Sequence, residues 1–341
     1  MNPYEKLPAR SFWRPAVATP SPDDIADVWT PAFAVDPDQP VLTAGSCFAA
    51  RLGPALLDQG LNWFETELPP PGLTASQRRA GGYGEFSFRT GNIYTPAMLR
   101  QWLAWACGHD DPPATAWEHD GRWYDPFRPR LAGHDSPAAV HAARAVTLDA
   151  IRAGLAGAGC LIVTMGLIET WQDRADGSFY PSCPGTVRGT FDPQRHVLRR
   201  QTFADAYADL AAAVAWARTD NPGLHVLFTV SPQPLTATAT AEHALTANGY
   251  TKSLLRTATG QLALDDPGVD YFPAFELMTG LPFRSRHFGD NLRTVTGDGV
   301  AFVLRHFMTA LAGAPAGPRP LSAPTGRDDC DDILLDYYGP R

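Results

Sequence analysis

Short apolar runs alternate along this chain with longer segments in which apolar residues recur every three or four positions. Four of the runs end in small or polar residues and predict buried strands, at residues 40–44, 160–165, 225–230 and 269–275. Helical patterns lie between and after these runs, at residues 48–59, 95–105, 137–156, 202–219, 247–262 and 299–311. Strands that alternate with helices predict a mostly parallel sheet with helices on both faces. We therefore expect an α/β fold, a three-layer sandwich of flavodoxin-like strand order.

Three segments depart from this alternation. Residues 62–136 are rich in Pro, Gly, Trp and Arg and contain one clear helical pattern, so we expect a long elaboration packed over the sheet. Residues 172–199 predict a loop that contains a hairpin. Residues 313–341 are interpreted as a Pro/Gly-rich linker followed by an acidic tail. The expected organisation is thus one domain over residues 1–312 and a separate tail.

Composition narrows the function. The net charge is −8 and the 28 Lys and Arg residues form no basic run, which argues against a nucleic-acid partner. The five cysteines contain no C-x-x-C pair, which argues against a disulfide framework or a zinc ribbon, and a cytoplasmic location is expected. No uninterrupted apolar window reaches the length of a membrane span. A nucleotide-binding fingerprint and an H-E-x-x-H helix are also missing, so we expect no cofactor and no metal.

The turn after the first predicted strand is the main candidate for chemistry. It reads T-A-G-S-C-F-A from Thr43 and places Ser46 and Cys47 before a predicted helix. In open parallel sheets ligands bind at the carboxyl ends of the strands, near the point where the strand order reverses. A cysteine at the N-terminus of a helix is favoured as a thiolate nucleophile. Cys47 is therefore the first candidate, although it could instead be a small buried apolar side chain.

The chain resembles the GSCFA family, which is related to the SGNH (GDSL-like) hydrolases. Beyond the pentapeptide, the resemblance includes F-S-F-R-T-G-N-I-Y-T, D-P-F-R-P, G-L-I-E-T-W, S-P-Q-P-L and Y-F-P-A-F-E, in that order along the chain. Laid on the G-D-S turn of SGNH enzymes, G-S-C places Cys47 at the nucleophile, and the reverse assignment to Ser46 stays open. The resemblance further implies that Gly91 and Asn92 donate to an oxyanion, and it makes Gly166 a candidate for binding the substrate or the oxyanion.

The G-x-N-D block of SGNH enzymes corresponds to Gly166–Glu169, where Ile168 stands in place of the asparagine that completes the oxyanion hole. Glu169 can still orient a partner, or form an ion pair with an arginine such as Arg89 or Arg128.

A larger departure lies after the last strand. The D-x-x-H pair that supplies the SGNH base is absent from residues 290–300, where Arg293 or Thr294 occupies the histidine position. Two other histidines could serve as the base: His243, which precedes the pair Thr251 and Lys252, and His287. Arg293 could clamp a carboxylate or phosphate, or pair with Asp290.

We therefore expect an esterase or acyltransferase with a small-molecule or glycan substrate, such as a polysaccharide precursor, and acyl-CoA only as a donor. The aromatic segment 117–129 offers stacking faces to a sugar, but its composition favours the core of a loop. Two alternatives stay open: a binding or scaffold protein that lost its triad, and an enzyme that uses Glu169 or Glu276 as the base. The sequence does not determine the oligomeric state.

Overall fold

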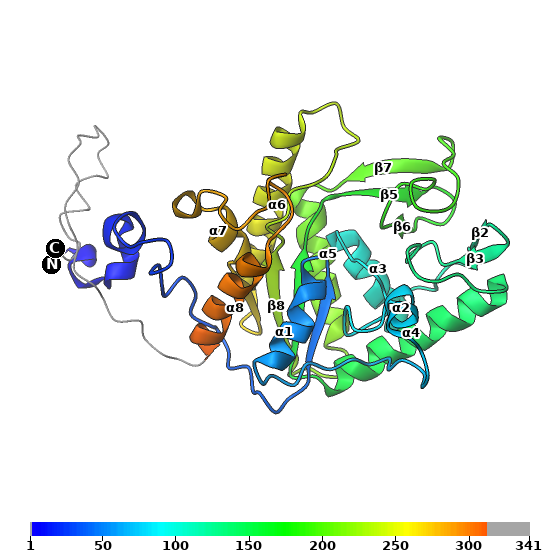
Figure 1. The fold of residues 1–341 in the computed structure, drawn as a ribbon, viewed down its shortest axis with the longest axis horizontal. Coiled ribbons are helices and arrows are strands. Elements are labelled where there is room, and N and C mark those ends of the chain that lie inside the picture. The colour runs from blue at the N-terminus through cyan, green and yellow to red at the C-terminus, as the bar shows by residue number, and fades with distance from the viewer. Residues whose placement is uncertain (1, 312–341) are drawn as a thin grey trace. The chain divides into compact units, whose positions relative to one another are not determined.

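The computed structural model describes residues 2–311, and a four-stranded parallel sheet lies at the centre of residues 32–274 (Figure 1). Its strands are β1 (Val41–Gly45), β4 (Cys160–Met165), β8 (His225–Val230) and β9 (Val269–Phe272), in that spatial order. Every residue of β1 and β4 is buried, which accounts for their unbroken apolar runs. The predicted α/β class and its four parallel strands are confirmed.

The strand order reverses at β1. On the edge of β1 that faces away from β4, Val41 forms a parallel bridge with Trp63. The N–H of Val41 donates to the carbonyl oxygen of Asn62 at 2.8 Å, and the N–H of Phe64 donates to Val41 at 3.0 Å. Residues 62–64 thus lie where the second strand of a flavodoxin-like sheet would lie, but they pair with β1 through a single bridge. The flavodoxin-like order is present in this form, and its switch point lies between β1 and β4.

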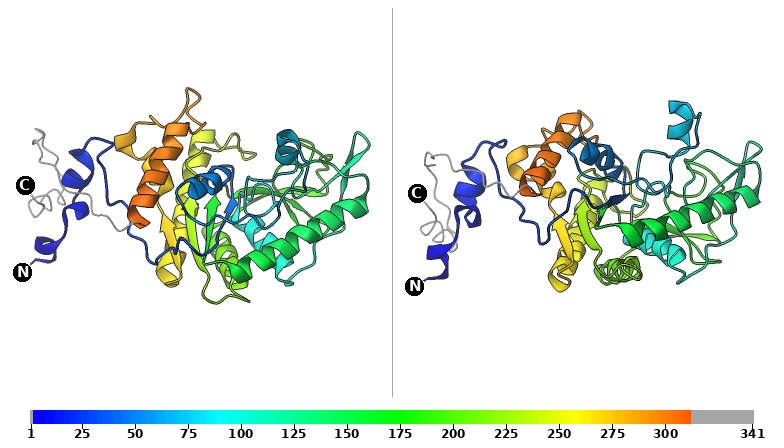
Figure 2. Two further views of the ribbon diagram at one scale, coloured as in Figure 1. Left: turned by 60° about the horizontal axis from the view of Figure 1, so that its bottom comes forward. Right: turned by 90° about the horizontal axis from the view of Figure 1, so that it is seen from below.

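Helices cover both faces of the sheet. Figure 2 shows α1 (Leu52–Asp58) on one face and α5 (Phe203–Ala217) with α6 (Ala244–Asp265) on the other, as in a three-layer sandwich. The predicted helix at residues 48–59 is shorter than expected, because it begins with the 3₁₀ turn η4 (Ala49–Arg51). At the start of α5, Thr202 and Asp205 form a capping box that satisfies free N–H groups of the first turn.

The insertions lie to one side of the central sheet (Figures 1 and 2). The first contains α2 (Ala75–Ala80), α3 (Pro96–Ala106) and the hairpin of β2 (Trp117–His119) with β3 (Arg122–Tyr124), and the long α4 (Pro137–Gly157) follows it. The second forms an antiparallel sheet of β5 (Glu169–Asp173), β6 (Phe179–Tyr180) and β7 (His196–Arg200), in the order β6-β5-β7. The hairpin predicted between residues 172 and 199 is therefore present.

Residues 2–31 and 275–311 form a second compact unit, a division that the sequence did not indicate. Its elements are η1 (Pro3–Lys6), η2 (Ala9–Ser11), η3 (Arg14–Ala18), most of α7 (Ala274–Thr279), η5 (Leu281–Phe283) and α8 (Gly297–Leu311). Within the unit the ring of Trp29 stacks on Phe307 at 5.5 Å, and Arg286 pairs with Asp23. These contacts join the two segments of the unit, which lie far apart in sequence. The predicted linker and acidic tail lie outside the described residues.

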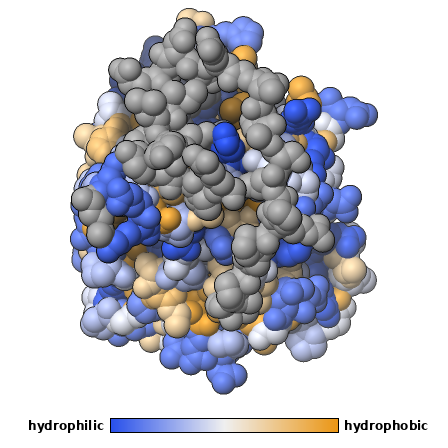
Figure 3. Space-filling view, turned by 90° about the vertical axis from the view of Figure 1, so that its left-hand side faces the viewer, coloured by the Kyte–Doolittle hydropathy of each residue, from blue (hydrophilic) through white to orange (hydrophobic). Residues whose placement is uncertain are grey.

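Across residues 2–311, no helix combines the length and the apolar character that a membrane crossing requires. The face drawn in Figure 3 mixes hydrophilic residues with smaller hydrophobic areas.

Candidate functional site

The turn after β1 is shaped by one glycine. Gly45 has φ +129°, and a Cβ atom at this position would lie 2.3 Å from the carbonyl oxygen of Thr164 on β4. The next residue, Ser46, donates its backbone N–H to that same oxygen at 2.9 Å. The chain therefore leaves β1 tightly against β4, and the residues that follow begin at the carboxyl edge of the sheet.

Ser46 and Cys47 have different surroundings. Ser46 is 2% exposed, and its hydroxyl has no hydrogen-bond partner among the described residues. Cys47 is half-buried, and its thiol donates to Oε1 of Gln233 at 3.0 Å. Of the two, Cys47 is the side chain that a substrate can reach.

Gly166 connects four segments at this edge. Its N–H and that of Leu167 donate to the carbonyl oxygen of Tyr94 at 3.0 and 2.9 Å, and its own carbonyl accepts from Nζ of the buried Lys252 at 2.9 Å. A Cβ atom on Gly166 would lie 3.1 Å from Cβ of Ser46. The predicted role of Gly166 in binding an oxyanion is therefore not supported, because its N–H is already engaged.

The loop at residues 89–93 ends beside β1. The N–H of Ile93 donates to the carbonyl oxygen of Gly45 at 2.8 Å, two residues before Cys47. Gly91 has φ +65°, a left-handed conformation that suits glycine. Within the part of the chain that the structure describes, the N–H groups of Gly91 and Asn92 donate to no other group. Their predicted role as oxyanion donors stays a prediction.

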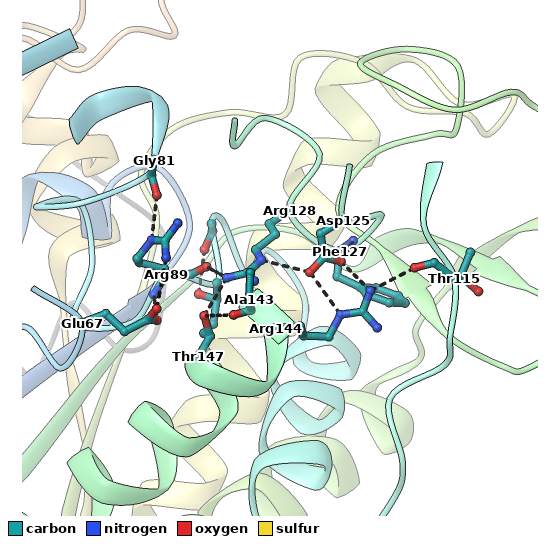
Figure 4. A network of polar contacts seen from close by, with 12 residues as sticks. Glu67, Gly81, Arg89, Thr115, Asp125, Phe127, Arg128, Ala143, Arg144 and Thr147 are labelled. Atoms are coloured by element: carbon teal, nitrogen blue, oxygen red, sulfur yellow. Dashed lines mark hydrogen bonds and ion pairs between the residues drawn. The ribbon is translucent and has the colours of Figure 1, made fainter. Parts of the chain in front are cut away.

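A buried network of charged residues holds the loop at residues 89–93 through the carbonyl oxygen of Arg89 (Figure 4). Asp125 accepts from Nε of Arg128 at 3.0 Å and from Arg144 at 2.9 Å, and all three residues are at most 4% exposed. A terminal nitrogen of Arg128 donates to the carbonyl oxygen of Arg89 at 2.7 Å. Burial alone would raise the pKa of Asp125, but Arg128 and Arg144 outweigh it and hold that pKa below its usual value. The motif D-P-F-R-P is thus a structural anchor for residues 89–93.

Glu169 holds the loop that follows β8. Its carboxylate accepts from the hydroxyl of Thr238 at 2.8 Å and from the N–H of Ala239 at 3.2 Å. The ion pairs considered for it are not formed, since Arg89 pairs with Glu67 and Arg128 with Asp125.

His243 caps a helix. It is the residue before α6, its side chain is exposed, and its Nδ1 accepts from the N–H of Leu245 at 3.2 Å. In a neutral ring this bond uses the one acceptor nitrogen and places the proton on Nε2. The ring then has no free lone pair for a thiol proton, so this geometry does not support the predicted role of His243 as a base.

The remaining candidates, His287, Arg293 and Glu276, belong to the second unit. His287 is 5% exposed, its ring stacks on Phe302 at 4.4 Å, and its Nε2 accepts from Arg286 at 3.3 Å. Burial and the neighbouring Arg286 lower the pKa of His287. Among the described residues Arg293 forms no ion pair with Asp290, and Glu276 lies in the first turn of α7.

Residues 125–129 of the aromatic segment are buried, whereas residues 118–122 are exposed. Phe127 is 1% exposed, and its ring lies 5.6 Å from that of Tyr180, which also contacts Trp117 at 5.1 Å. The buried part is the core of a loop, the second of the two interpretations made from sequence.

Gln233 is a site residue that was not predicted, although its position in S-P-Q-P-L, directly after the third predicted strand, is a usable signal. The side chain of a residue at that position reaches the same edge of the sheet as Cys47. Residues 2–311 contain no group of three His, Cys, Asp or Glu side chains placed to hold a metal ion.

A family model described as the GSCFA family matches residues 40–307. Neither the curated proteins nor the solved structures include a match to the chain. The matched range begins just before β1 and ends within α8.

Proposed function

This chain belongs to the GSCFA family, and we propose that it is an esterase or acyltransferase that forms an acyl-enzyme on Cys47. The resemblance of its G-S-C turn to the G-D-S turn of SGNH hydrolases supports acyl-group chemistry. The substrate class that we propose is an acylated or hydroxyl-bearing small molecule or carbohydrate, with acyl-CoA as a possible donor.

One observation carries the proposal: the reachable nucleophile lies at the switch point of the sheet. Cys47 follows the strand at which the order reverses, and its half-buried sulfur contacts a polar amide. Clefts at this point of open parallel sheets are the usual place for ligands. Ser46 is enclosed and its hydroxyl cannot reach a substrate without a rearrangement of the turn.

The chemistry begins with loss of the thiol proton to water. The sulfur of Cys47 then attacks the acyl carbon, the C–S bond forms, and the carbonyl electrons move to oxygen. When this tetrahedral intermediate collapses, the bond to the leaving alcohol or thiol breaks, and the leaving group takes a proton from water. Water or a sugar hydroxyl then attacks the thioester and releases the free cysteine. Free N–H groups at Gly91 and Asn92 are candidate donors to the oxyanion.

The use of sulfur explains how the chain can work without the D-x-x-H pair. A serine hydroxyl is scarcely ionised near pH 7 and needs a base, whereas a cysteine is a few per cent thiolate there without one and is intrinsically more nucleophilic. The replacement of serine by cysteine and the loss of the histidine are then two parts of one change.

Intact-mass measurement tests the proposal. The protein is incubated with a panel of acyl-CoA thioesters, acetylated sugars and p-nitrophenyl acetate, and we expect an acyl adduct on the wild type. Cys47→Ala should abolish the adduct, while Ser46→Ala, its neighbour in the same turn, should retain it. An adduct that survives in Cys47→Ala and disappears in Ser46→Ala would transfer the role to Ser46.

A second candidate function is that of a binding protein on this fold. It is favoured by the partner of Cys47, since within residues 2–311 the hydrogen bond of its thiol goes to a neutral amide and not to a histidine or carboxylate. On this alternative the wild type forms no adduct with any acyl donor of the panel, yet one of the sugars or thioesters raises its melting temperature.

A further inference from the structure

We propose that Gln233 is a catalytic residue, whose side-chain amide holds the thiol of Cys47 in the resting protein and donates to the oxyanion of the acyl intermediate. This inference rests on the proposed function. It adds a residue that neither the turn motif nor the position of the missing histidine indicates.

The first support is contact. Oε1 of Gln233 lies 3.0 Å from the sulfur of Cys47, so its amide group is beside the atom that would bond to the acyl carbon. The oxygen of a tetrahedral intermediate is attached to that carbon, and a donor next to the sulfur can reach it. The half-buried position of Gln233 keeps the amide at the edge of the site and partly away from water.

The second support is that the loop after β4 lacks a hydrogen-bond donor for the oxyanion. Ile168, which stands where an asparagine would donate, is fully buried and has an apolar side chain. The N–H groups of Gly166 and Leu167 on the same loop are both engaged by Tyr94. The loop after β4 therefore supplies no donor from these residues, and the loop after β8 contributes an amide instead.

The third support is the chemistry of the amide group. A glutamine side chain has an acceptor oxygen and an NH₂ with two donors, and rotation of the amide plane by about 180° exchanges them. In the resting thiol the oxygen accepts the S–H hydrogen. After the thiol has lost its proton to water, rotation presents N–H to the negative sulfur and then to the oxyanion. Gln233 gains and loses no proton in either step.

The fourth support is the anchoring of the loop that carries Gln233. The N–H of Gln233 donates to the hydroxyl of Ser231 at 3.3 Å, and the N–H of Leu235 donates to Asn248 on α6 at 3.2 Å. Further along, Glu169 accepts from Thr238. These bonds fix the loop at residues 233, 235 and 238, so its backbone has little freedom to lose when a substrate binds, while the amide plane is not among the groups they hold.

Two reactions of the Cys47 sulfur can distinguish the two roles that Gln233 could have, as an oxyanion donor or as a residue that only maintains the structure of the turn. Acylation by p-nitrophenyl acetate passes through an oxyanion, whereas alkylation by iodoacetamide is a direct displacement and forms none. We expect Gln233→Leu to lower the rate of Cys47 acylation by about 10²- to 10³-fold and to change alkylation by only a few-fold. Gln233→Glu, which cannot donate when ionised, should lose at least as much acylation as Gln233→Leu.

The matched control is Gln261→Leu, which removes an amide that bonds Asp265 on the exposed side of α6 and should leave both rates unchanged. Equal losses of acylation and alkylation in Gln233→Leu, or no loss of either, would overturn the inference while acylation of the wild type upheld the proposed function. If the wild type is alkylated at Cys47 but not acylated, the proposed function fails and the inference fails with it. Melting temperatures of all variants show whether each of them is folded.

Discussion

At the scale of single residues, position in the turn matters more than side-chain chemistry alone. Ser46 and Cys47 are neighbours, yet one hydroxyl is enclosed without a partner and one thiol is reachable. The difference originates at Gly45, because its left-handed backbone conformation brings the chain into close contact with Thr164 on β4 just before Ser46. A side chain at residue 45 would therefore disturb the fold and the candidate site together.

We expect Gly45→Ala to lower the free energy of unfolding by about 3 kcal/mol or more, because it adds a steric clash to an unfavourable dihedral angle. The added Cβ would meet the backbone of Thr164 at 2.3 Å, and neither strand can move without breaking the ladder. The measurement is urea denaturation followed by circular dichroism.

Gly60→Ala is the control for this prediction. Gly60 also has a positive φ, +85°, but nothing lies within 4 Å of a Cβ atom there. It should cost about 1–2 kcal/mol, the contribution of the dihedral angle alone. Equal losses in the two variants would show that the contact with β4 is not tight.

At the scale of elements, the sequence predicts the regular parts of the fold well. The runs at residues 160–165 and 225–230 became strands with those bounds, because buried parallel strands need continuous apolar residues. The bridge at Trp63 could not be predicted, since one bridging residue has no periodicity to detect. The cap formed by His243 could not be predicted either, because a histidine that caps a helix and one that serves as a base occupy the same place in the sequence, just before a helix.

The charge network behind residues 89–93 is expected to stabilise the insertion strongly. Asp125→Asn should lower the free energy of unfolding by about 3–5 kcal/mol, since two buried guanidinium groups lose their counter-charge. Asp149→Asn, which breaks the exposed pair with Arg152 on α4, should cost no more than about 0.5 kcal/mol. Urea denaturation of both variants is the measurement, and a small loss in Asp125→Asn would mean that water replaces the missing charge.

Helix α8 should weaken on acidification. Burial, then Arg305 and His287, lower the pKa of His306 to about 4, and burial and Arg286 lower that of His287. Above pH 6.5, the pKa of His306 in the unfolded chain, the ring is neutral in both the folded and the unfolded state. Below that pH the ring binds a proton in the unfolded state but stays neutral in the folded state until about pH 4. The free energy of opening should therefore fall between pH 6.5 and about 4, by at most about 2 kcal/mol for His306, whose ring is partly exposed.

Hydrogen exchange of α8 peptides at pH 7, 5.5 and 4.5, corrected for intrinsic rates, measures this loss. His306→Gln should flatten the dependence, because glutamine does not titrate in this range. The groups around the two rings include the acidic Asp23 and Asp298 as well as the arginines, and both carboxylates raise the pKa of His287. Opening free energies that stay constant from pH 7 to 4.5 would show that these carboxylates compensate the burial.

At the scale of the whole molecule, the division into two units has a consequence for the candidate site. Cys47, Gln233 and the loop at residues 89–93 all belong to residues 32–274, whereas His287, Arg293 and Glu276 belong to the other unit. The groups that the proposed chemistry uses are thus contained in one unit and joined by its own hydrogen bonds. The boundaries near residues 31 and 275 carry no signal in the sequence, so the predicted site residues came from both units.

The cysteines offer a measure of how cooperatively the larger unit opens. Cys160 begins β4, which lies between β1 and β8, and burial, with Asp270, raises its pKa to about 12. Cys183 lies in the second insertion and is half-buried. At pH 8 iodoacetamide should therefore label Cys160 at least about 10³-fold more slowly than Cys183, since reaction at β4 requires the sheet to open. Peptide mass spectrometry at increasing urea gives both rates, and that of Cys160 should rise with the slope of global unfolding. A Cys160 rate that does not change at low urea would instead mean that β4 is reached by a local opening of the sheet.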